Sequence, residues 1–148
     1  MEMNGIAHIQ LTVSRFAECV EFYRRLLLYL EMKTIFDNDE VFYCVGSRTG
    51  VAITPADSQN SKERFVQRRV GLHHFCFRAR QREHIDRLYE FLLEMNAKIV
   101  HPPQDGPWAE GYYSVLFEDP DGIRIEANHV PGKGNLDPKV ELPISSTS

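Results

Sequence analysis

The sequence lacks long apolar runs, an excess of basic charge and a cysteine framework. No apolar run approaches the ~20 residues that a membrane-spanning helix needs, so we expect no membrane partner. The net charge is -4, whereas proteins that bind nucleic acid usually present a basic face, so we expect no nucleic-acid partner. The three cysteines, Cys19, Cys44 and Cys76, are odd in number and scattered, which favours reduced thiols over disulfides.

Residues 1–5 also lack a basic segment followed by an apolar one, the pattern of a secretory signal. Together with the scattered cysteines, this predicts a cytoplasmic protein. The chain has 148 residues, of which 43% are hydrophobic and 26% charged. These values are typical of one globular domain with a core of useful size.

Two stretches of the chain begin in the same way and carry a histidine at the same place. Gly5-Ile6-Ala7-His8 opens the first half, and Gly71-Leu72-His73-His74 opens the second. An internal repeat of this kind predicts that the fold is built from two similar units. It also predicts that His8 and His74 occupy equivalent positions.

The order of predicted elements repeats as well. Residues 7–13 alternate between apolar and polar, which predicts a strand, and an apolar stripe from Phe16 to Leu30 predicts a helix capped by Ser14. Two further strands are predicted in this half, at 41–45 and 51–54. In the second half we expect a strand at 72–78, a helix from Ile85 to Met95 ending near Asn96, and strands at 99–100, 112–117 and 123–128. Each half therefore reads as one strand, one helix and about three strands, which makes the fold class α+β.

We expect a single domain over residues 1–130, with a C-terminal tail at 131–148. Module one covers about 5–56, a polar linker covers 57–69, and module two covers about 70–130. The tail is rich in proline, glycine and serine. It is predicted to be a loose arm that packs on a neighbour or stays disordered.

Three side chains with metal-binding chemistry lie on the polar faces of predicted strands. Alternation places His8, His74 and Glu126 opposite the apolar residues of their own strands, whereas His73 falls on the apolar side. Taken alone, a strand histidine is more often structural than a ligand. The repeat changes this, because it pairs His8 with His74. Two imidazoles and one carboxylate form a known type of divalent-metal site.

The residues around these side chains resemble the vicinal oxygen chelate superfamily, also called the glyoxalase/bleomycin resistance protein/dioxygenase family. The similar motifs are Ala-His-Ile-Gln-Leu at 7–11, His-His-Phe-Cys-Phe at 73–77 and Asp-Pro-Asp-Gly-Ile-Arg-Ile-Glu at 119–126. The resemblance covers roughly residues 5–130. It implies two βαβββ modules that pair into a cup-shaped mixed sheet around one divalent metal ion (Mn, Zn, Ni or Fe). It further implies His8, His74 and Glu126 as ligands and a homodimer as the assembly.

Departures from the family's patterns bear on the reaction. Aligning residues 51–54 with 123–126 puts Thr54 where glyoxalase I-like members carry a fourth ligand, usually glutamate, which disfavours lactoylglutathione chemistry. Leu116 stands where ring-cleaving dioxygenases carry a tyrosine. Gln10 replaces a threonine of the fosfomycin-modifying members. Three interpretations stay open: a metal-dependent lyase, isomerase or transferase, a single-domain Fe(II) dioxygenase, and a non-enzymatic small-molecule binding or resistance protein.

The substrate is expected to be a small, anionic molecule with vicinal oxygens, because two histidines and one carboxylate leave a divalent ion with net positive charge and open positions. Five residues are expected to line its pocket: Gln10, Thr54, Trp108, Tyr112 and Arg124. Arg124 would balance a second negative charge, although a plain surface role is an equal alternative. Trp108 serves equally well as a packing or dimer contact. No single residue is identified as catalytic.

Overall fold

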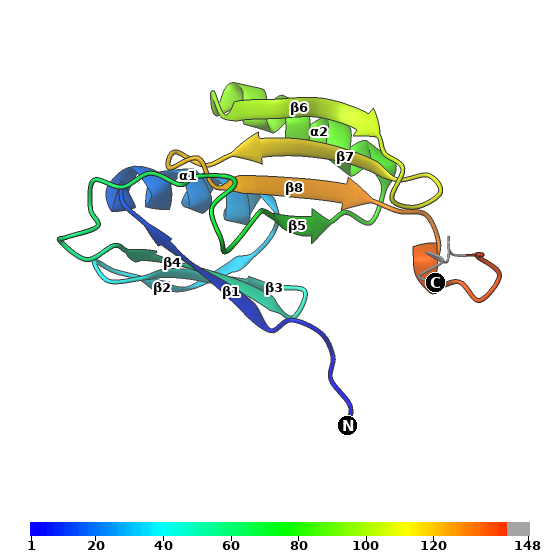
Figure 1. The fold of residues 1–148 in the computed structure, drawn as a ribbon, viewed down its shortest axis with the longest axis horizontal. Coiled ribbons are helices and arrows are strands. Elements are labelled where there is room, and N and C mark those ends of the chain that lie inside the picture. The colour runs from blue at the N-terminus through cyan, green and yellow to red at the C-terminus, as the bar shows by residue number, and fades with distance from the viewer. Residues whose placement is uncertain (142–148) are drawn as a thin grey trace. The chain divides into compact units, whose positions relative to one another are not determined.

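The computed structural model describes residues 1–141 of the chain, which form two βαβββ halves (Figure 1). The first half contains β1 (His8–Val13), α1 (Phe16–Tyr29), β2 (Lys33–Asp37), β3 (Phe42–Gly46) and β4 (Thr49–Pro55). The second half contains β5 (Phe75–Arg78), α2 (Arg82–Glu94), β6 (Lys98–Asp105), β7 (Tyr113–Glu118) and β8 (Arg124–His129), followed by the 3₁₀ helix η1 (Gly134–Leu136). None of the helices in the described part is long and apolar enough to cross a membrane.

The two halves form sheets of identical topology. The strand orders are β1-β4-β3-β2 and β5-β8-β7-β6. In each sheet the first and last strands of the half pair in parallel, and the remaining neighbours pair antiparallel. The predicted α+β class and the two βαβββ modules are therefore confirmed. The sequence interpretation missed β2.

The chain divides into two compact units, and one short segment of the second half belongs to the first unit. Among the described residues, the first unit holds 1–71 together with 119–123, and the second holds 72–118 and 124–141. Residues 56–74, which include the predicted linker, contain neither helix nor strand. The part of this segment up to Gly71 nevertheless belongs to the first unit, where the Phe65 amide donates a 3.1 Å hydrogen bond to the Asp121 carbonyl.

The core of the first unit lies between α1 and its sheet. Val20, Tyr23 and Leu27 of the predicted stripe are buried, and α1 packs on β4 and β2. The prediction that Ser14 caps α1 is wrong. Arg15 is the N-cap residue, and its guanidinium has no acceptor to offer the first helix amides. Ser14 is engaged elsewhere, since its amide and hydroxyl both donate to the carboxylate of Asp121.

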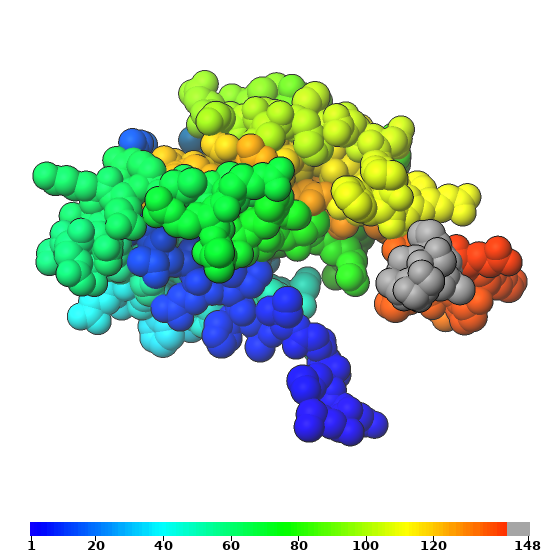
Figure 2. All heavy atoms as spheres, in the orientation of Figure 1, coloured from blue at the N-terminus to red at the C-terminus, as the bar shows by residue number. Residues whose placement is uncertain are grey.

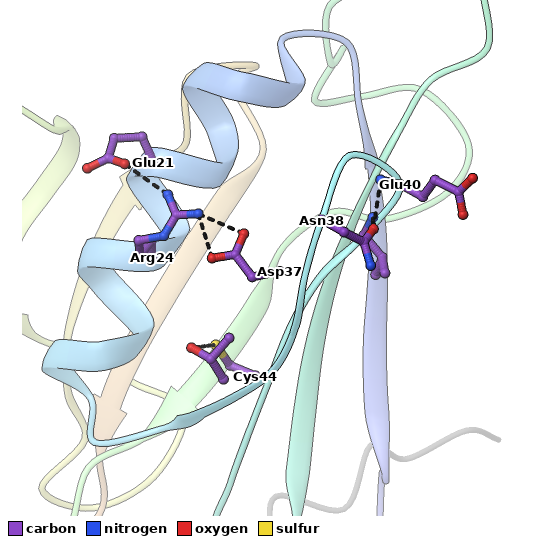
Figure 3. Close-up of polar contacts among 8 residues, drawn as sticks. Glu21, Arg24, Asp37, Asn38, Glu40 and Cys44 are labelled. Atoms are coloured by element: carbon purple, nitrogen blue, oxygen red, sulfur yellow. Dashed lines mark hydrogen bonds and ion pairs between the residues drawn. The ribbon is translucent and has the colours of Figure 1, made fainter.

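Arg24 ties the solvent side of α1 to the edge strand β2 (Figure 3). Its guanidinium donates to both oxygens of Asp37, at 2.8 and 2.9 Å, and to Glu21 at 2.9 Å. The same group lies 5.2 Å from the ring centre of Phe42. Beyond β2, the Asn38 side chain accepts hydrogen bonds from two backbone amides and closes the turn into β3. These contacts explain how an exposed strand keeps its place.

The second unit repeats this plan. Ile85, Leu88 and Leu92 of the predicted stripe are buried, and α2 packs on β6, β7 and β8. The helix ends as predicted, since Asn96 has a φ of 55° and the next amide donates to the Leu92 carbonyl.

The tail was expected to be loose, but its first residues pack on their own unit. Asn135 Nδ2 donates a 3.0 Å hydrogen bond to the Trp108 carbonyl, and Pro131 lies against Gly111. These residues are otherwise largely exposed, and the expectation of a loose arm stays a prediction. The end of the predicted tail, residues 142–148, lies outside the described residues.

Candidate metal centre

Strand pairing in the second unit fixes which side chains share a face. Cys76 is the Cα partner of Glu126, and Phe75 is the partner of Ile125. Phe75 and Ile125 are buried, whereas Glu126 lies on the opposite, less buried face, as predicted. The predicted strand at 72–78 is shorter than expected. It begins at Phe75, so His74 precedes β5.

The structure brings His74 and Glu126 into direct contact. His74 Nε2 lies 3.0 Å from Glu126 Oε2, and the two side chains are 35% and 12% exposed. The His74 nitrogen and the Glu126 oxygen therefore lie side by side on the polar face of β8. Strand alternation had placed both side chains on polar faces, and the structure adds that they are in contact.

The second ring nitrogen of His74 is engaged by its neighbour. The Nδ1 atoms of His73 and His74 lie 2.7 Å apart, so one of them donates and the other accepts. When His74 carries its proton on Nδ1 and donates to His73, its Nε2 presents a lone pair beside the Glu126 carboxylate. Sequence reasoning gave His73 no part in the site. Strand alternation says nothing about a pair of residues that precedes the strand.

Tyr112 completes the surroundings of the carboxylate. Its hydroxyl donates a hydrogen bond to Glu126 Oε1, so each carboxylate oxygen has its own partner. Burial, and then this hydrogen bond, raise the pKa of Tyr112 well above its usual value, which keeps the phenol protonated at neutral pH. Tyr112 was expected to line the pocket. The structure gives it a direct contact with a candidate ligand.

Arg124 lies on the same face but is already paired. Its Nε atom is 3.6 Å from Glu118 Oε1, and Lys98 Nζ is 3.0 Å from the other oxygen of that carboxylate. The three side chains together carry one net positive charge. Arg124 can therefore attract an anion, with Glu118 holding part of its charge.

Cys76 carries an uncharged thiol on this face. Desolvation of the sulfur, followed by the negative charge of Glu126, raises the pKa of the thiol to about 12. The thiol donates to the Phe77 carbonyl at 3.4 Å. The thiol of Cys76 is therefore protonated at neutral pH in the metal-free protein.

In the first unit, His8 opens β1 and shares an exposed face with Gln10, while Leu11 and Val13 are buried. The predicted alternation of this strand is confirmed. Thr54 lies in β4, and its hydroxyl donates to the Leu11 carbonyl at 3.2 Å. Trp108 lies in the loop between β6 and β7 and is 71% exposed.

Strand register corrects the alignment that assigned Thr54 to the fourth-ligand place. In the second unit the partner of Glu126 is Cys76, two residues after His74. In the first unit the residue two after His8 is Gln10, and its partner in β4 is Ala52. The counterpart of Glu126 is therefore Ala52, and the sequence alignment was wrong by two residues. The conclusion that no carboxylate stands there is unchanged.

A tyrosine that the sequence analysis missed lies beside this place. Tyr43 on β3 is the Cα partner of Ala52. A Cβ built on Gly50 would lie 2.5 Å from the Tyr43 hydroxyl, so the phenol rests on the bare backbone of Gly50. Gly50 is in turn the partner of His8. The glycine thus lets an aromatic hydroxyl approach the strand that carries His8.

The His74–Glu126 pair fits two adjacent ligands of one ion. Bonds of about 2.1 Å at right angles put two donor atoms about 3.0 Å apart, which matches the observed separation. Within residues 1–141 no three His, Cys, Asp or Glu side chains form a group that could hold a metal ion. His8 belongs to the first unit, whereas His74 and Glu126 belong to the second.

The repeat, the topology and the paired histidine and glutamate agree with a match to a known family. The model of the Glyoxalase/Bleomycin resistance protein/Dioxygenase superfamily matches residues 5–127. The chain belongs to this superfamily. A divalent metal ion is a common cofactor in it, and its members bind small molecules.

Individual relatives are distant. The protein YqjT of Bacillus subtilis (strain 168) is 36% identical over 62 residues, a match that spans 39% of this chain and less than half, 46%, of that protein. The metallothiol transferase FosB of Shouchella clausii (strain KSM-K16) is 27% identical over 85% of this chain and 80% of its own. Among solved structures, a glyoxylase/bleomycin resistance protein/dioxygenase domain from Frankia sp. EAN1pec has a TM-score of 0.70 at 22% identity, over 86% and 98% of the two chains. At that identity it supports the fold alone.

Proposed function

We propose that this protein is a divalent-metal-dependent enzyme that acts on a small, anionic substrate with vicinal oxygens. The observation that carries the proposal is the pair of donor atoms 3.0 Å apart on His74 and Glu126. Each of these ligands is held from behind, His74 by His73 and Glu126 by Tyr112. Such outer contacts are typical of metal ligands, because they fix the tautomer and the orientation of the donor.

His8 is the proposed third ligand, supplied by the same chain or by a second copy in a homodimer. It lies on the exposed face of its strand, and the repeat makes it the equivalent of His74. With two neutral imidazoles and one carboxylate, a divalent ion keeps a net positive charge and open positions. Such an ion, whether Mn, Zn, Ni or Fe, would act as a Lewis acid on a substrate oxygen.

The remaining roles follow from the side chains. Arg124, held near Glu118, would attract the negative charge of the substrate, and the Gln10 amide would bind a substrate oxygen on the His8 face. Tyr43 offers a further hydroxyl near the same strand. Thr54 would contribute at most packing, because its hydroxyl is engaged by the Leu11 carbonyl. Trp108 is too exposed to serve as a pocket wall within its own unit.

Among the classes left open by the sequence, a transferase is favoured. The support is the 27% identity to a metallothiol transferase over 85% of this chain. A lyase or isomerase that needs a fourth carboxylate ligand is less well supported, since the counterpart of Glu126 is Ala52. The free state of Cys19, Cys44 and Cys76 supports a cytoplasmic location as part of the same proposal.

Elemental analysis of protein purified without a tag or a chelator tests the proposal. We expect close to one divalent ion per site in the wild type, and its loss in His8→Ala, His74→Ala and Glu126→Ala. His84→Ala on α2 is the matched control and should keep the metal. Absence of metal in the wild type would overturn the proposal, and retained binding of apolar ligands would then identify a binding protein. Iron as the bound metal, together with oxygen consumption, would support the dioxygenase interpretation instead.

A further inference from the structure

Two adjacent tyrosines before and at the start of β7 have different partners. The Tyr112 hydroxyl donates to Glu126 Oε1. The Tyr113 hydroxyl donates to Asp86 on α2, and the guanidinium of Arg82 lies 3.6 Å from the centre of its ring. The pair therefore offers a natural comparison, since the same chemical group bonds a candidate metal ligand in one case and a helix surface in the other.

The loop between β6 and β7 is shaped to place the ring of Tyr112. The Gly106 amide donates to the Tyr112 carbonyl at 3.0 Å, which closes the loop. A Cβ on Gly106 would lie 2.9 Å from Cδ1 of Tyr112, closer than real side chains approach. The missing side chain at Gly106 thus leaves the space that the tyrosine ring needs.

The segment after β8 supports this loop from the other side. Gly111 has a φ of 71° and lies against Pro131, where an added Cβ would be 2.7 Å from the proline ring. Asn135 holds the Trp108 carbonyl at 3.0 Å. Figures 1 and 2 show the loop, in yellow, at the surface near the orange segment that follows β8. The position of Tyr112 is therefore defined by contacts on both sides of its loop.

We propose that Tyr112 is a positioning residue, which occupies Oε1 of Glu126 and so reserves Oε2 for a metal ion shared with His74. This inference rests on the proposed function. The geometry that carries it is that the two oxygens of Glu126 have different partners. The Tyr112 hydroxyl donates to Oε1, and Nε2 of His74 lies 3.0 Å from Oε2. With Oε1 occupied by Tyr112, Glu126 would hold a metal ion through Oε2 alone, which would leave room for a substrate oxygen.

Titration of the full-length apoprotein with Co²⁺ alone tests this role, followed by calorimetry and by the visible absorption of the bound ion. Removal of an outer partner of a ligand typically costs 10–100-fold in metal affinity, so we expect Tyr112→Phe to weaken Co²⁺ binding by about 10-fold or more. The matched control Tyr113→Phe should stay within about twofold of the wild type. The absorption intensity should also fall in Tyr112→Phe, because a released carboxylate can bind through both oxygens and raise the coordination number.

Glu126→Ala separates the existence of the metal site from the positioning role of Tyr112. If Glu126→Ala abolishes Co²⁺ binding while Tyr112→Phe and Tyr113→Phe bind alike, the positioning role is overturned and the metal site stands. Tighter binding by Tyr112→Phe would overturn it equally. If the wild type itself fails to bind Co²⁺, the proposed function falls and this inference with it. Thermal unfolding of the apoproteins distinguishes a loss of fold from a loss of affinity, and both tyrosine variants should unfold within about 4–8 °C of the wild type.

Discussion

The hydroxyl of Tyr23 on α1 donates a 2.7 Å hydrogen bond to Oδ2 of Asp119, and both side chains are buried. The other oxygen of Asp119 accepts the amides of Asp121 and Ile123 at 2.9 Å each. Burial outweighs these hydrogen bonds and raises the pKa of Asp119 to about 6. The Asp119 carboxylate thus has a full set of hydrogen bonds, yet burial still makes its ionised form unfavourable.

Asp119→Asn should change the dependence of stability on pH. A folded pKa above the usual 3.8 means that the stabilising contribution of Asp119 is complete below about pH 4 and is lost as the pH rises towards 6. At about 1.4 kcal/mol per pKa unit, the loss is of order 3 kcal/mol. Relative to the wild type, Asp119→Asn should therefore gain stability between pH 4 and pH 7, as measured by urea unfolding at several pH values.

The control is Asp39→Asn in an exposed loop, which should show no such gain over the same range. Comparison with the wild type at each pH removes the contributions of groups common to both proteins. A constant difference between Asp119→Asn and the wild type from pH 4 to pH 7 would contradict the assignment of the raised pKa to Asp119.

Asp121 should be needed for the stability of the first unit. It accepts the amide and the hydroxyl of Ser14, and Arg64 donates to the same hydroxyl at 2.7 Å. Asp121→Ala leaves the Ser14 amide without this acceptor, so we expect a loss of about 1–3 kcal/mol in the free energy of unfolding. Asp121→Asn keeps one acceptor oxygen and should lose less. Equal stability of the alanine variant and the wild type would show that solvent replaces the carboxylate at no cost.

His73→Ala should weaken metal binding without abolishing it. His73 holds Nδ1 of His74 at 2.7 Å and is expected to act on the orientation of that ring. The expected loss of affinity is about 10-fold, in the range usual for outer partners of ligands, whereas His74→Ala should remove binding. Calorimetric titration of both variants checks this, with His84→Ala as the control. Complete loss of metal in His73→Ala alone would make His73 the ligand.

Much of the fold follows from periodicity that short-range patterns reveal. Alternation assigned His8 and Glu126 to polar faces, and the helical stripes assigned Tyr23 and Leu92 to the core. These predictions succeed because one face of each element is buried, so a mistake of one residue would bury a charge. Strand β2 was not predicted, because its residues are mostly exposed and show no clear alternation of apolar and polar side chains.

Two of the failures come from pairings between residues that are far apart in the chain. Ser14 has the chemistry of a helix cap, but Asp121, 107 positions away, takes both of its donors. Thr54 was aligned with Glu126 by counting residues. The residue of β4 that corresponds to Glu126 is Ala52. This correspondence depends on the register of the parallel strands, which no local sequence pattern reveals. His73 and Tyr112 gained their roles through side-chain contacts that only the structure shows.

The place of a fourth ligand gives the sharpest test of the register. Ala52 is the counterpart of Glu126, and Thr54 lies two residues further along β4, roughly 6.6 Å away. Ala52→Glu should therefore tighten divalent-metal binding and weaken the binding of oxalate to the metal-loaded protein. Both effects follow from charge, since an added carboxylate attracts the cation and repels the anion.

Three variants make that result specific. Ala52 is only 7% exposed, so Ala52→Gln is needed as an uncharged control of the same size, and it should change neither affinity. Thr54→Glu should also leave metal affinity unchanged, and Thr54→Ala should keep the metal, because the Thr54 hydroxyl is engaged by Leu11 rather than by the site. Isothermal titration with metal, and then with oxalate, measures all four variants. If Thr54→Glu tightens metal binding and Ala52→Glu does not, the ligand-bearing positions of the two units are not equivalent in the way that their strand registers imply.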